Sequence, residues 1–192
     1  MPTQKPFLII ITGFSCTGKT TLGKRLAQEL HLPFIYKDGI KELLLDDLGW
    51  PDRAWSRKLG QATYSILYHL IEAMLTGGCS LIVESNFSPT FSTPDFLALQ
   101  QRCNFDPFQI LCFTTSADLL LQRGKERAAA GNRHPGHFDR WYYEESEPIP
   151  PTGREDPLPI GGPVLEVDTT EFSAIDYRKI IAVVSAFIAE RR

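Results

Sequence analysis

A short stretch near the amino terminus carries the clearest chemical signal in the sequence. Residues 13–20, GFSCTGKT, match the phosphate-binding pattern G-x-x-x-x-G-K-[ST] at every fixed position. Gly13 and Gly18 can adopt backbone angles closed to other residues, which lets successive N–H groups wrap around phosphate oxygens. Lys19 would reach the β- and γ-phosphates of ATP, and Thr20 would offer its hydroxyl to Mg²⁺. The pattern therefore predicts a P-loop.

The residues around the motif support this interpretation. Residues 7–11 are an apolar run that suits a strand buried on both faces, and residues 19–30 have apolar positions at helical spacing. An ordinary glycine loop is the alternative, but the flanking strand and helix are where the motif requires them. The expected nucleotide-binding residues of this region are Gly13, Phe14, Ser15, Cys16, Thr17, Gly18, Lys19, Thr20 and Thr21.

Asp38 is the candidate catalytic base. It follows residues 33–36, which predict a short second strand. Phosphoryl transfer to a hydroxyl needs a carboxylate that accepts the hydroxyl proton and orients its oxygen. The alternative is an N-cap for a helix that begins near Gly39, because Asp is favoured at that position. The two roles are compatible.

Glu84 ends an otherwise apolar run, residues 80–84, that predicts a third strand. A carboxylate at this place can hold Mg²⁺ directly or through water, or it can bind an acceptor group. A solvated strand end is the alternative. Thr20 and Glu84 are therefore the expected metal-binding residues, and Asn86 is close enough in sequence to contact a substrate.

Two arginines lie four residues apart on a helix predicted over residues 117–130. One guanidinium would stack on adenine and the other would stabilise charge on the transferring phosphoryl group. Cations that only complement the helix dipole are the alternative. Because a long polar loop follows, we assign Arg123 to nucleotide binding and Arg127 to catalysis, beside Lys19 and Asp38, with Arg133 as a third candidate cation.

Residues 131–162 are rich in proline, glycine, histidine and charge, and their periodicity is weak. A loop of this length in a compact domain is usually functional, so we expect a mobile lid and acceptor-binding insert over about 128–162. His134 and His137 can contact substrate, but H-x-x-H without further ligands is poor evidence for a metal site. Residues 141–143, WYY, predict either an acceptor-binding wall or packing for the lid.

The composition limits the classes of protein to consider. The chain has 192 residues, 43% hydrophobic and 22% charged, and a formal net charge of −3. This negative charge argues against a general nucleic-acid binder, which usually has a basic excess. Four scattered cysteines without a C-x-x-C pair indicate reduced thiols in a cytoplasmic protein. The apolar run at residues 7–11 is too short for a signal peptide or a membrane span.

Strands and helices alternate along the chain, which predicts one α/β domain over residues 1–192 with helices on both faces of a parallel sheet. Pro94 suits the first turn of the helix that is expected after the third strand. Ligands bind at the carboxyl ends of such strands. The polar residues Asp38, Glu84 and Asp168 would therefore meet the P-loop there. The expected strands are residues 7–11, 33–36, 80–84, 107–114 and 163–168.

These motifs, in this order, resemble the small P-loop kinases of the nucleoside-monophosphate-kinase-like group. The resemblance is strongest to a branch of predicted kinases with an AAA-type ATP-binding domain, near chloramphenicol phosphotransferase, the zeta-toxin kinases and polynucleotide kinase. It covers nearly the whole chain, although only the P-loop is specific by itself. The matching segments are GFSCTGKTT, YKDGIKELL, LIVESNF, LLLQRGKERAAAGNRHPGH and VDTT.

The resemblance implies a P-loop NTPase fold, a three-layer α/β/α sandwich with a five-stranded parallel sheet of order 2-3-1-4-5. It implies ATP with Mg²⁺ as the donor, and it places Asp168 and Thr169 near the adenine. Many relatives have an arginine soon after the catalytic Asp to hold the acceptor. Here Lys41 is the possible substitute.

We therefore expect an ATP-dependent kinase that phosphorylates a hydroxyl of a small molecule. One alternative is a polynucleotide 5′-hydroxyl kinase, which needs a basic single-strand channel that the net charge disfavours. Another is an ATP-binding or ATP-hydrolysing regulatory module without an acceptor. The sequence predicts neither the acceptor nor the oligomeric state.

Overall fold

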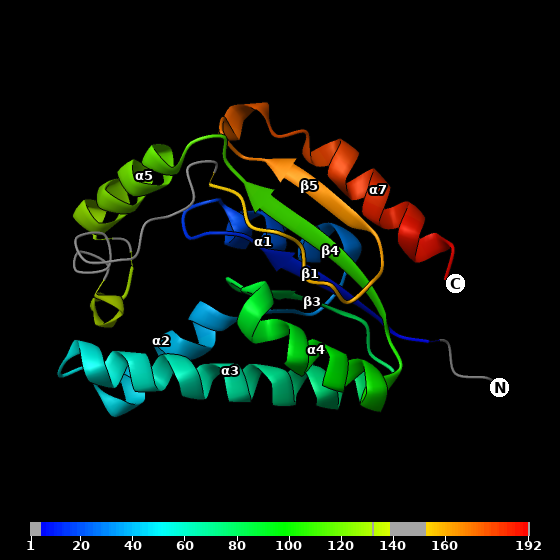
Figure 1. Cartoon of the computed structure of the whole chain (residues 1–192), viewed down its shortest axis with the longest axis horizontal. Coiled ribbons are helices and arrows are strands. Elements are labelled where there is room, and N and C mark those ends of the chain that lie inside the picture. The colour runs from blue at the N-terminus through cyan, green and yellow to red at the C-terminus, as the bar shows by residue number, and fades with distance from the viewer. Residues whose placement is uncertain (1–4, 132, 139–152, 192) are drawn as a thin grey trace.

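The protein is an α/β sandwich built on one parallel sheet (Figure 1). The computed structural model describes residues 5–131, 133–138 and 153–191. All strand pairs are parallel and the order is β2-β3-β1-β4-β5, which confirms the expected fold and strand order. The strands are β1 (Phe7–Thr12), β2 (Phe34–Tyr36), β3 (Leu81–Glu84), β4 (Asp106–Phe113) and β5 (Val164–Asp168).

Helices cover both faces of the sheet, which makes three layers (Figure 1). Side chains alternate along β1, so Ile9 and Ile11 face one helical layer while Leu8 and Ile10 face the other. All four are fully buried, because both faces are covered. The first layer contains α1 (Lys19–Leu30) and α7 (Tyr177–Ala189), and the second contains α3 (Arg53–Thr76) and α4 (Pro89–Cys103).

The remaining elements lie toward the carboxyl ends of the strands (Figure 1). Here α5 follows β4 and projects past the sheet, and α2 connects β2 to α3. This end of the sheet is therefore enclosed by elements other than the two packing layers. These elements are α2 (Lys37–Leu48), α5 (Ala117–Ala130) and the 3₁₀ turns η1 (Pro135–His137) and η2 (Phe172–Ala174).

Two expected helix starts are wrong. Helix α4 begins at Pro89, so Pro94 is not in its first turn, because Ser88 and Pro89 supply an N-cap and a first-position proline earlier in the chain. Pro94 lies inside the helix, where the Thr93 hydroxyl donates to the Pro89 carbonyl. Helix α2 begins at Lys37, so Asp38 lies in its first turn and is not its N-cap.

The last part of the expected lid is instead part of the core. Leu158 and Ile160 are buried with the α3 and α4 side chains. The Gln109 side chain donates to the Leu158 carbonyl and accepts from its N–H, at 2.9 and 2.8 Å. Residues 153–162 therefore cover β4 on the face where α3 and α4 cover the neighbouring strands. The expected aromatic segment at 141–143 lies outside the described residues.

Within the part of the chain that the structure describes, none of the helices has the length and apolar character needed to cross a bilayer.

Candidate active site

The P-loop connects β1 to α1 and depends on two glycines. Gly13 has φ +134°, and a Cβ atom there would lie 2.0 Å from the Cys112 carbonyl oxygen of β4. Gly18 has φ +78° and forms the N-cap of α1. Any larger residue at position 13 would collide with backbone, so the loop can run this close to β4 only with glycine. The Thr17 hydroxyl donates to the Phe14 carbonyl and closes the loop on itself.

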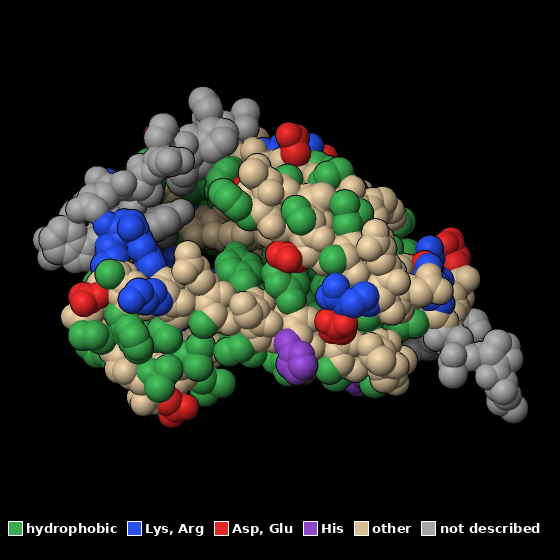
Figure 2. Space-filling view, turned by 60° about the horizontal axis from the view of Figure 1, so that its bottom comes forward, with side chains coloured by type: hydrophobic (Ala, Val, Ile, Leu, Met, Phe, Trp, Pro, Cys, Tyr) green, Lys and Arg blue, Asp and Glu red, His purple; other side chains and the backbone are tan. Residues whose placement is uncertain are grey.

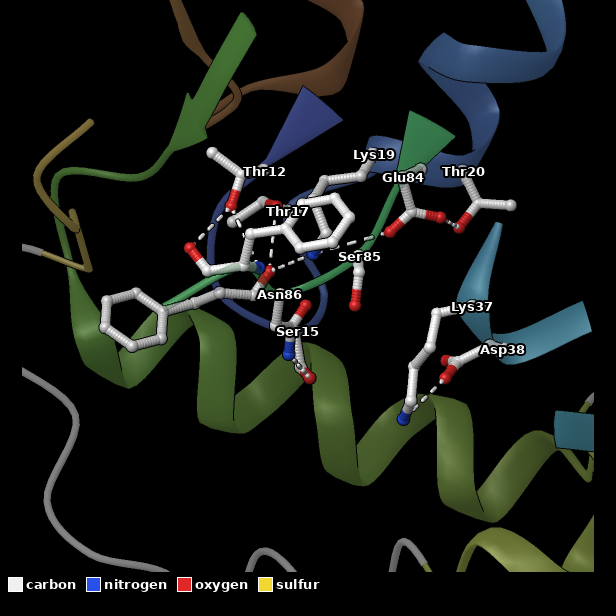
Figure 3. Close-up of polar contacts among 12 residues, drawn as sticks. Thr12, Ser15, Thr17, Lys19, Thr20, Lys37, Asp38, Glu84, Ser85 and Asn86 are labelled. Carbon is white, nitrogen blue, oxygen red and sulfur yellow. Dashed lines mark hydrogen bonds and ion pairs between the residues drawn. The ribbon is translucent and has the colours of Figure 1, made fainter. Parts of the chain in front are cut away.

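Lys19 and Thr20, at the start of α1, both face Glu84 at the end of β3 (Figure 3). The Thr20 hydroxyl donates to Glu84 Oε2 at 2.7 Å, and Lys19 Nζ lies 4.0 Å from Glu84 Oε1. Lys19 Nζ also donates to the Phe14 carbonyl at 2.7 Å. The parallel register that sets Ile11 beside Glu84 brings β3 to the P-loop. The structure thus joins Thr20 to Glu84, which the sequence separates by 64 positions.

Glu84 is a buried carboxylate, not a solvated strand end, with 6% of the residue exposed. Burial raises the pKa of Glu84, while the Lys19 ammonium and the Thr20 hydroxyl oppose the rise. A buried carboxylate beside a hydroxyl is a donor set that suits a hard cation such as Mg²⁺. Among the described residues there is no group of three or more His, Cys, Asp and Glu side chains that could hold a metal by itself.

Asp38 points toward the same region from the first turn of α2 (Figure 3). Its carboxylate pairs with Arg133 through Oδ2 and with Lys37 Nζ through Oδ1, the latter at 3.5 Å. Burial by itself would raise the pKa of Asp38, but the charges of Arg133, Lys37, His137 and Lys19 hold it well below its usual range. The side chain is therefore ionised at neutral pH.

One cavity of about 500 Å³ brings most of the predicted site residues together. The P-loop, the first turn of α2, the end of β3 and the helix α5 each contribute to its wall. Figure 2 shows Lys and Arg side chains gathered at the left end of the molecule, the end at which α5 lies in Figure 1. The predicted residues in the lining are Ser15, Cys16, Gly18, Lys19, Thr20, Thr21, Asp38, Glu84, Asn86, Arg123 and Arg127.

Sequence reasoning missed Glu126, Ala130 and Phe172, which also line the cavity. Glu126 and Ala130 lie one helical turn from predicted arginines, so helical spacing from those arginines could have identified them. Phe172 had no comparable signal, since η2 becomes part of the wall only through the packing of the chain after β5. Its ring lies 3.8 Å below the Arg123 guanidinium, measured from Cζ to the ring centroid.

Arg123 is held in place before any ligand binds. Besides its contact with Phe172, it donates through Nη2 to the Thr170 carbonyl at 2.8 Å. Its Nη1 is buried and has no hydrogen-bond partner among the described residues. A buried donor without a partner is costly, so this nitrogen is available to a ligand in the cavity.

Asp168 and Thr169 do not line this cavity. Asp168 Oδ1 accepts from the Thr170 N–H and hydroxyl at 2.8 and 2.6 Å, and Thr169 donates to the Phe113 carbonyl. These bonds fix the loop whose Thr170 carbonyl holds Arg123. Contact of Asp168 and Thr169 with a nucleotide stays a prediction, whereas the bonds of Asp168 hold Thr170, which in turn contacts Arg123.

The segment after α5 is docked on α2 and α3. His134 Nε2 lies 3.1 Å from Asp46 Oδ1, and His137 Nε2 lies 3.0 Å from Glu42 Oε1. The Ser56 hydroxyl of α3 donates to the Gly136 carbonyl at 2.6 Å. The two histidines therefore pair with carboxylates of α2. Lys41, the expected substitute for an acceptor-binding arginine, is buried and is absent from the cavity wall.

Comparison with solved structures supports the fold and the class. A crystal structure described as a "putative kinase" from Chloroflexus aurantiacus J-10-fl is 41% identical, with a TM-score of 0.84 over 98% of this chain and 99% of that one. A gluconokinase from Sinorhizobium meliloti 1021 is 17% identical, with a TM-score of 0.51 over 97% of this chain and 94% of that one. The APS kinase of Mycobacterium tuberculosis is 13% identical, with a TM-score of 0.58 over 95% and 99%. The last two show the shared fold alone.

The sequence comparisons agree. A shikimate kinase from Bacteroides fragilis is 63% identical over 30 residues, a match that spans only 16% of this chain and 17% of that enzyme. The model of a family described as an AAA domain matches residues 8–141, which is more than two thirds of the chain. The protein therefore belongs to this AAA-domain family, among the small P-loop kinases of the nucleoside-monophosphate-kinase-like group.

Proposed function

We propose that this protein is a kinase that transfers the γ-phosphoryl group of ATP, with Mg²⁺, to a hydroxyl of a small-molecule acceptor. The observation that carries the proposal is the single cavity shared by Lys19 and Thr20 of the P-loop, Asp38 of α2 and Arg127 of α5. The groups proposed to bind the phosphates, to act as base and to stabilise the transferred phosphoryl group come from three separate elements, and a kinase mechanism accounts for their meeting in one cavity. The related APS kinase structure contains AMPPNP, which supports a nucleotide as donor.

The P-loop residues would bind the triphosphate. The Lys19 ammonium, which donates to the Phe14 carbonyl, would exchange this partner for β- and γ-phosphate oxygens. Thr20 and Glu84, already 2.7 Å apart, would hold Mg²⁺ directly or through water. The metal would neutralise charge on the phosphates. Arg123, with its buried unpartnered Nη1, would bind the nucleotide from α5.

Asp38 would act on the acceptor. The acceptor oxygen forms a bond to the γ-phosphorus as the bond to the β,γ-bridging oxygen breaks, and ADP leaves. The hydroxyl proton passes to Asp38. Because the pKa of this carboxylate is held well below its usual range, it is a weak base that orients the hydroxyl first and takes the proton late. A loose transition state, in which the nucleophile contributes little, tolerates a late proton transfer.

Arg127 and Arg133 would provide charge from the lid side. Arg127 lines the cavity, where it would stabilise the transferring phosphoryl group. Arg133 pairs with Asp38 across 95 residues of sequence. Docking of the segment after α5 would therefore also position the Asp38 carboxylate. Closing this segment would exclude water from the phosphates.

The test is ADP release from Mg·ATP with a panel of acceptors: nucleosides, nucleoside monophosphates, sugars, sugar acids, aminoglycosides and 5′-hydroxyl oligonucleotides. Lys19→Ala is the control, because the substitution removes the phosphate-binding charge. Release that rises with one acceptor class, and is absent in the variant, supports the proposal. Tight ATP binding with no transfer to any acceptor would favour a regulatory module, and transfer only to oligonucleotides would favour a polynucleotide kinase.

A further inference from the structure

Three carboxylates lie along one side of α2, and the proposed chemistry uses only one of them. Asp38, Glu42 and Asp46 are spaced four residues apart, so they form one stripe on the helix surface. Asp38 lines the cavity, whereas Glu42 and Asp46 are absent from its wall. Like charges at this spacing destabilise a helix unless other groups compensate them. The two carboxylates outside the cavity therefore call for a role of their own.

All three carboxylates pair with one short segment, residues 133–138, which follows α5. The segment contains the turn η1, and Figure 1 shows this turn, in yellow, next to the left end of α3. Each of its three basic side chains contacts a different carboxylate, so the stripe on α2 is matched along its length. The pairs are Asp38 with Arg133, Glu42 with His137, and Asp46 with His134.

The contact between His137 and Glu42 is the enclosed one of the two histidine pairs. His137 Nε2 lies 3.0 Å from Glu42 Oε1, and the His137 side chain is only 4% exposed. Asp46, which faces His134, is 66% exposed. Water screens an exposed pair, and such a pair contributes little, whereas a hydrogen bond shielded from water is stronger. We therefore expect His137 and Glu42 to hold the segment.

The backbone of the segment fits closely against α2 and α3. A Cβ atom on Gly136 would lie 2.8 Å from Trp50 Cβ and 2.9 Å from Leu45 Cδ2, so a larger residue would push the segment away. The buried Ser56 hydroxyl of α3 donates to the Gly136 carbonyl at 2.6 Å. The Gly136 N–H donates to His134 Nδ1 at 3.0 Å. The docked position of the segment is therefore well defined.

Arg133 reaches Asp38 from this docked segment. It lies four residues before His137, and its guanidinium donates to Asp38 Oδ2. Holding a long arginine side chain in one geometry costs conformational entropy. The cost is smaller when the backbone that carries the side chain is already fixed. The contact of His137 with Glu42 therefore acts on Arg133 through the backbone between them.

The placement of Arg133 decides how Asp38 faces an acceptor. Arg133 contacts Oδ2 of the carboxylate, and Lys37 Nζ lies 3.5 Å from Oδ1. Contacts on both oxygens limit rotation of the carboxylate and so set the direction of its remaining lone pairs. A base must lie within hydrogen-bond reach of the proton that it takes. A small displacement of Arg133 would therefore slow proton transfer without removing the base.

We propose that His137 and Glu42 form a positioning pair: their contact holds residues 133–138 on α2 so that Arg133 orients the Asp38 carboxylate toward the acceptor hydroxyl. Neither His137 nor Glu42 touches the acceptor or the nucleotide in this role. The inference rests on the proposed kinase function. It assigns the segment after α5 a part in the transfer step that is separate from nucleotide binding.

The first test measures docking and needs no substrate. His137→Leu removes the hydrogen-bond donor, whereas His137→Gln keeps a nitrogen that can donate to Glu42. His69→Leu is the matched control, because His69 is an exposed residue of α3 and is absent from the cavity wall. Amide hydrogen exchange of residues 133–138 is measured by mass spectrometry on the full chain. Exchange should be at least about 10-fold faster in His137→Leu and close to wild type in the other two variants.

The second test measures transfer. Adenosine, AMP, D-glucose, D-gluconate and kanamycin represent the small-molecule classes of the panel above, and the compound that is phosphorylated fastest is used. His137→Leu is expected to lower kcat about 3- to 30-fold, because the base is misplaced but still present. His137→Gln should recover kcat to within about threefold of wild type, and the Kd for Mg·ATP should stay within about twofold in both variants.

A double-mutant cycle separates positioning from a merely structural role. If His137 acts through Arg133, His137→Leu should change kcat less than about twofold in an Arg133→Gln background. Loss of folded protein would instead lower kcat equally in both backgrounds. Glu42→Ala, which suits a helix, should reproduce the exchange and kcat of His137→Leu, and the combination of the two should be no worse than either alone.

Three results would overturn the proposal: wild-type exchange in His137→Leu, equal losses of kcat with and without Arg133, or an Mg·ATP affinity that falls as much as kcat. The last would place the segment in nucleotide binding. Failure of the kinase function looks different, because ADP release with all five compounds would then be the same in wild type and Lys19→Ala. That result would remove the kinase function and the positioning role together.

Discussion

Replacing Asp38 with asparagine tests the centre of the proposed mechanism. The substitution keeps the shape of the side chain and its place in the first turn of α2 but removes the charge that faces Arg133 and Lys37. We expect kcat to fall about 10²- to 10³-fold, while the Kd for Mg·ATP stays within twofold. Nucleotide binding is spared because the P-loop, Glu84 and Arg123 do not depend on Asp38 for any contact described above.

The magnitude follows from the surroundings of the carboxylate. A positioned general base contributes about 10²- to 10⁴-fold. The cations around Asp38 hold its pKa well below the usual range, so its basicity is low and the lower part of that interval applies. The expected loss corresponds to roughly 2.7–4 kcal/mol of transition-state stabilisation. Loss of the proton acceptor and of its charge accounts for most of it, since asparagine can still accept a hydrogen bond from the hydroxyl but cannot take the proton.

The pH dependence has a definite sign. A carboxyl group whose pKa is depressed in the folded protein stabilises it above the unfolded value of 3.8, and this stability is lost only as the pH falls through the folded value. Asp38 is therefore ionised from pH 5 to 8, and kcat/KM should show no acid limb from it. The defect of the variant should be constant over that range. The stability cost at pH 7 should be at most about 1 kcal/mol, because the Asp38 side chain is 38% exposed and solvent screens the pair.

The assay is coupled ADP release with the acceptor that the panel identifies, together with calorimetric titration of Mg·ATP. Asp47→Asn is the control, because Asp47 is also on α2, is exposed and is absent from the cavity wall. A fall in kcat of less than threefold would remove Asp38 from the mechanism. An acid limb between pH 5 and 6 that disappears in Asp38→Asn would refute the ionisation argument instead.

Three further substitutions have separate readouts. Glu84→Gln should raise the Mg²⁺ concentration that gives half-maximal activity. It should also raise the Tm at pH 7, because burial raises the pKa of Glu84 and the charged form therefore destabilises the folded protein. A lower Tm for this variant would contradict the prediction. Leu158→Ala should lower the free energy of unfolding, measured by urea titration, by about 2–5 kcal/mol, because Leu158 is buried. The exposed control Leu97→Ala should lower it by less than about 0.5 kcal/mol, and equal losses would show that residues 153–162 are not part of the core. Phe172→Ala should weaken ATP binding about 2- to 30-fold through loss of the Arg123 stacking, while Phe91→Ala, 80% exposed, should leave it unchanged.

Much of the fold was predictable because its signals are local. The buried strands are short apolar runs, and the helices Lys19–Leu30 and Ala117–Ala130 have the bounds that the sequence predicted. The start of α4 was missed because Pro94 in a second turn looks like a helix start, and the weaker signal of Ser88 and Pro89 preceded it. The last part of the expected lid was misassigned because residues 153–162 lack periodicity, although they pack on β4 through Leu158 and Ile160.

The sequence by itself determined the chemistry of the P-loop, since its glycines, Lys19 and Thr20 act within one continuous segment whose spacing sets their geometry. It also determined the strand order through the resemblance, and the meeting of Asp38 and Glu84 at one sheet edge through the rule that parallel strands end together. Only the tertiary structure decided which groups pair there. Arg133 meets Asp38 across 95 residues, and Phe172 stacks on Arg123. Such pairings depend on how separate elements pack, and no periodicity or spacing encodes a distance between segments that are far apart in the chain.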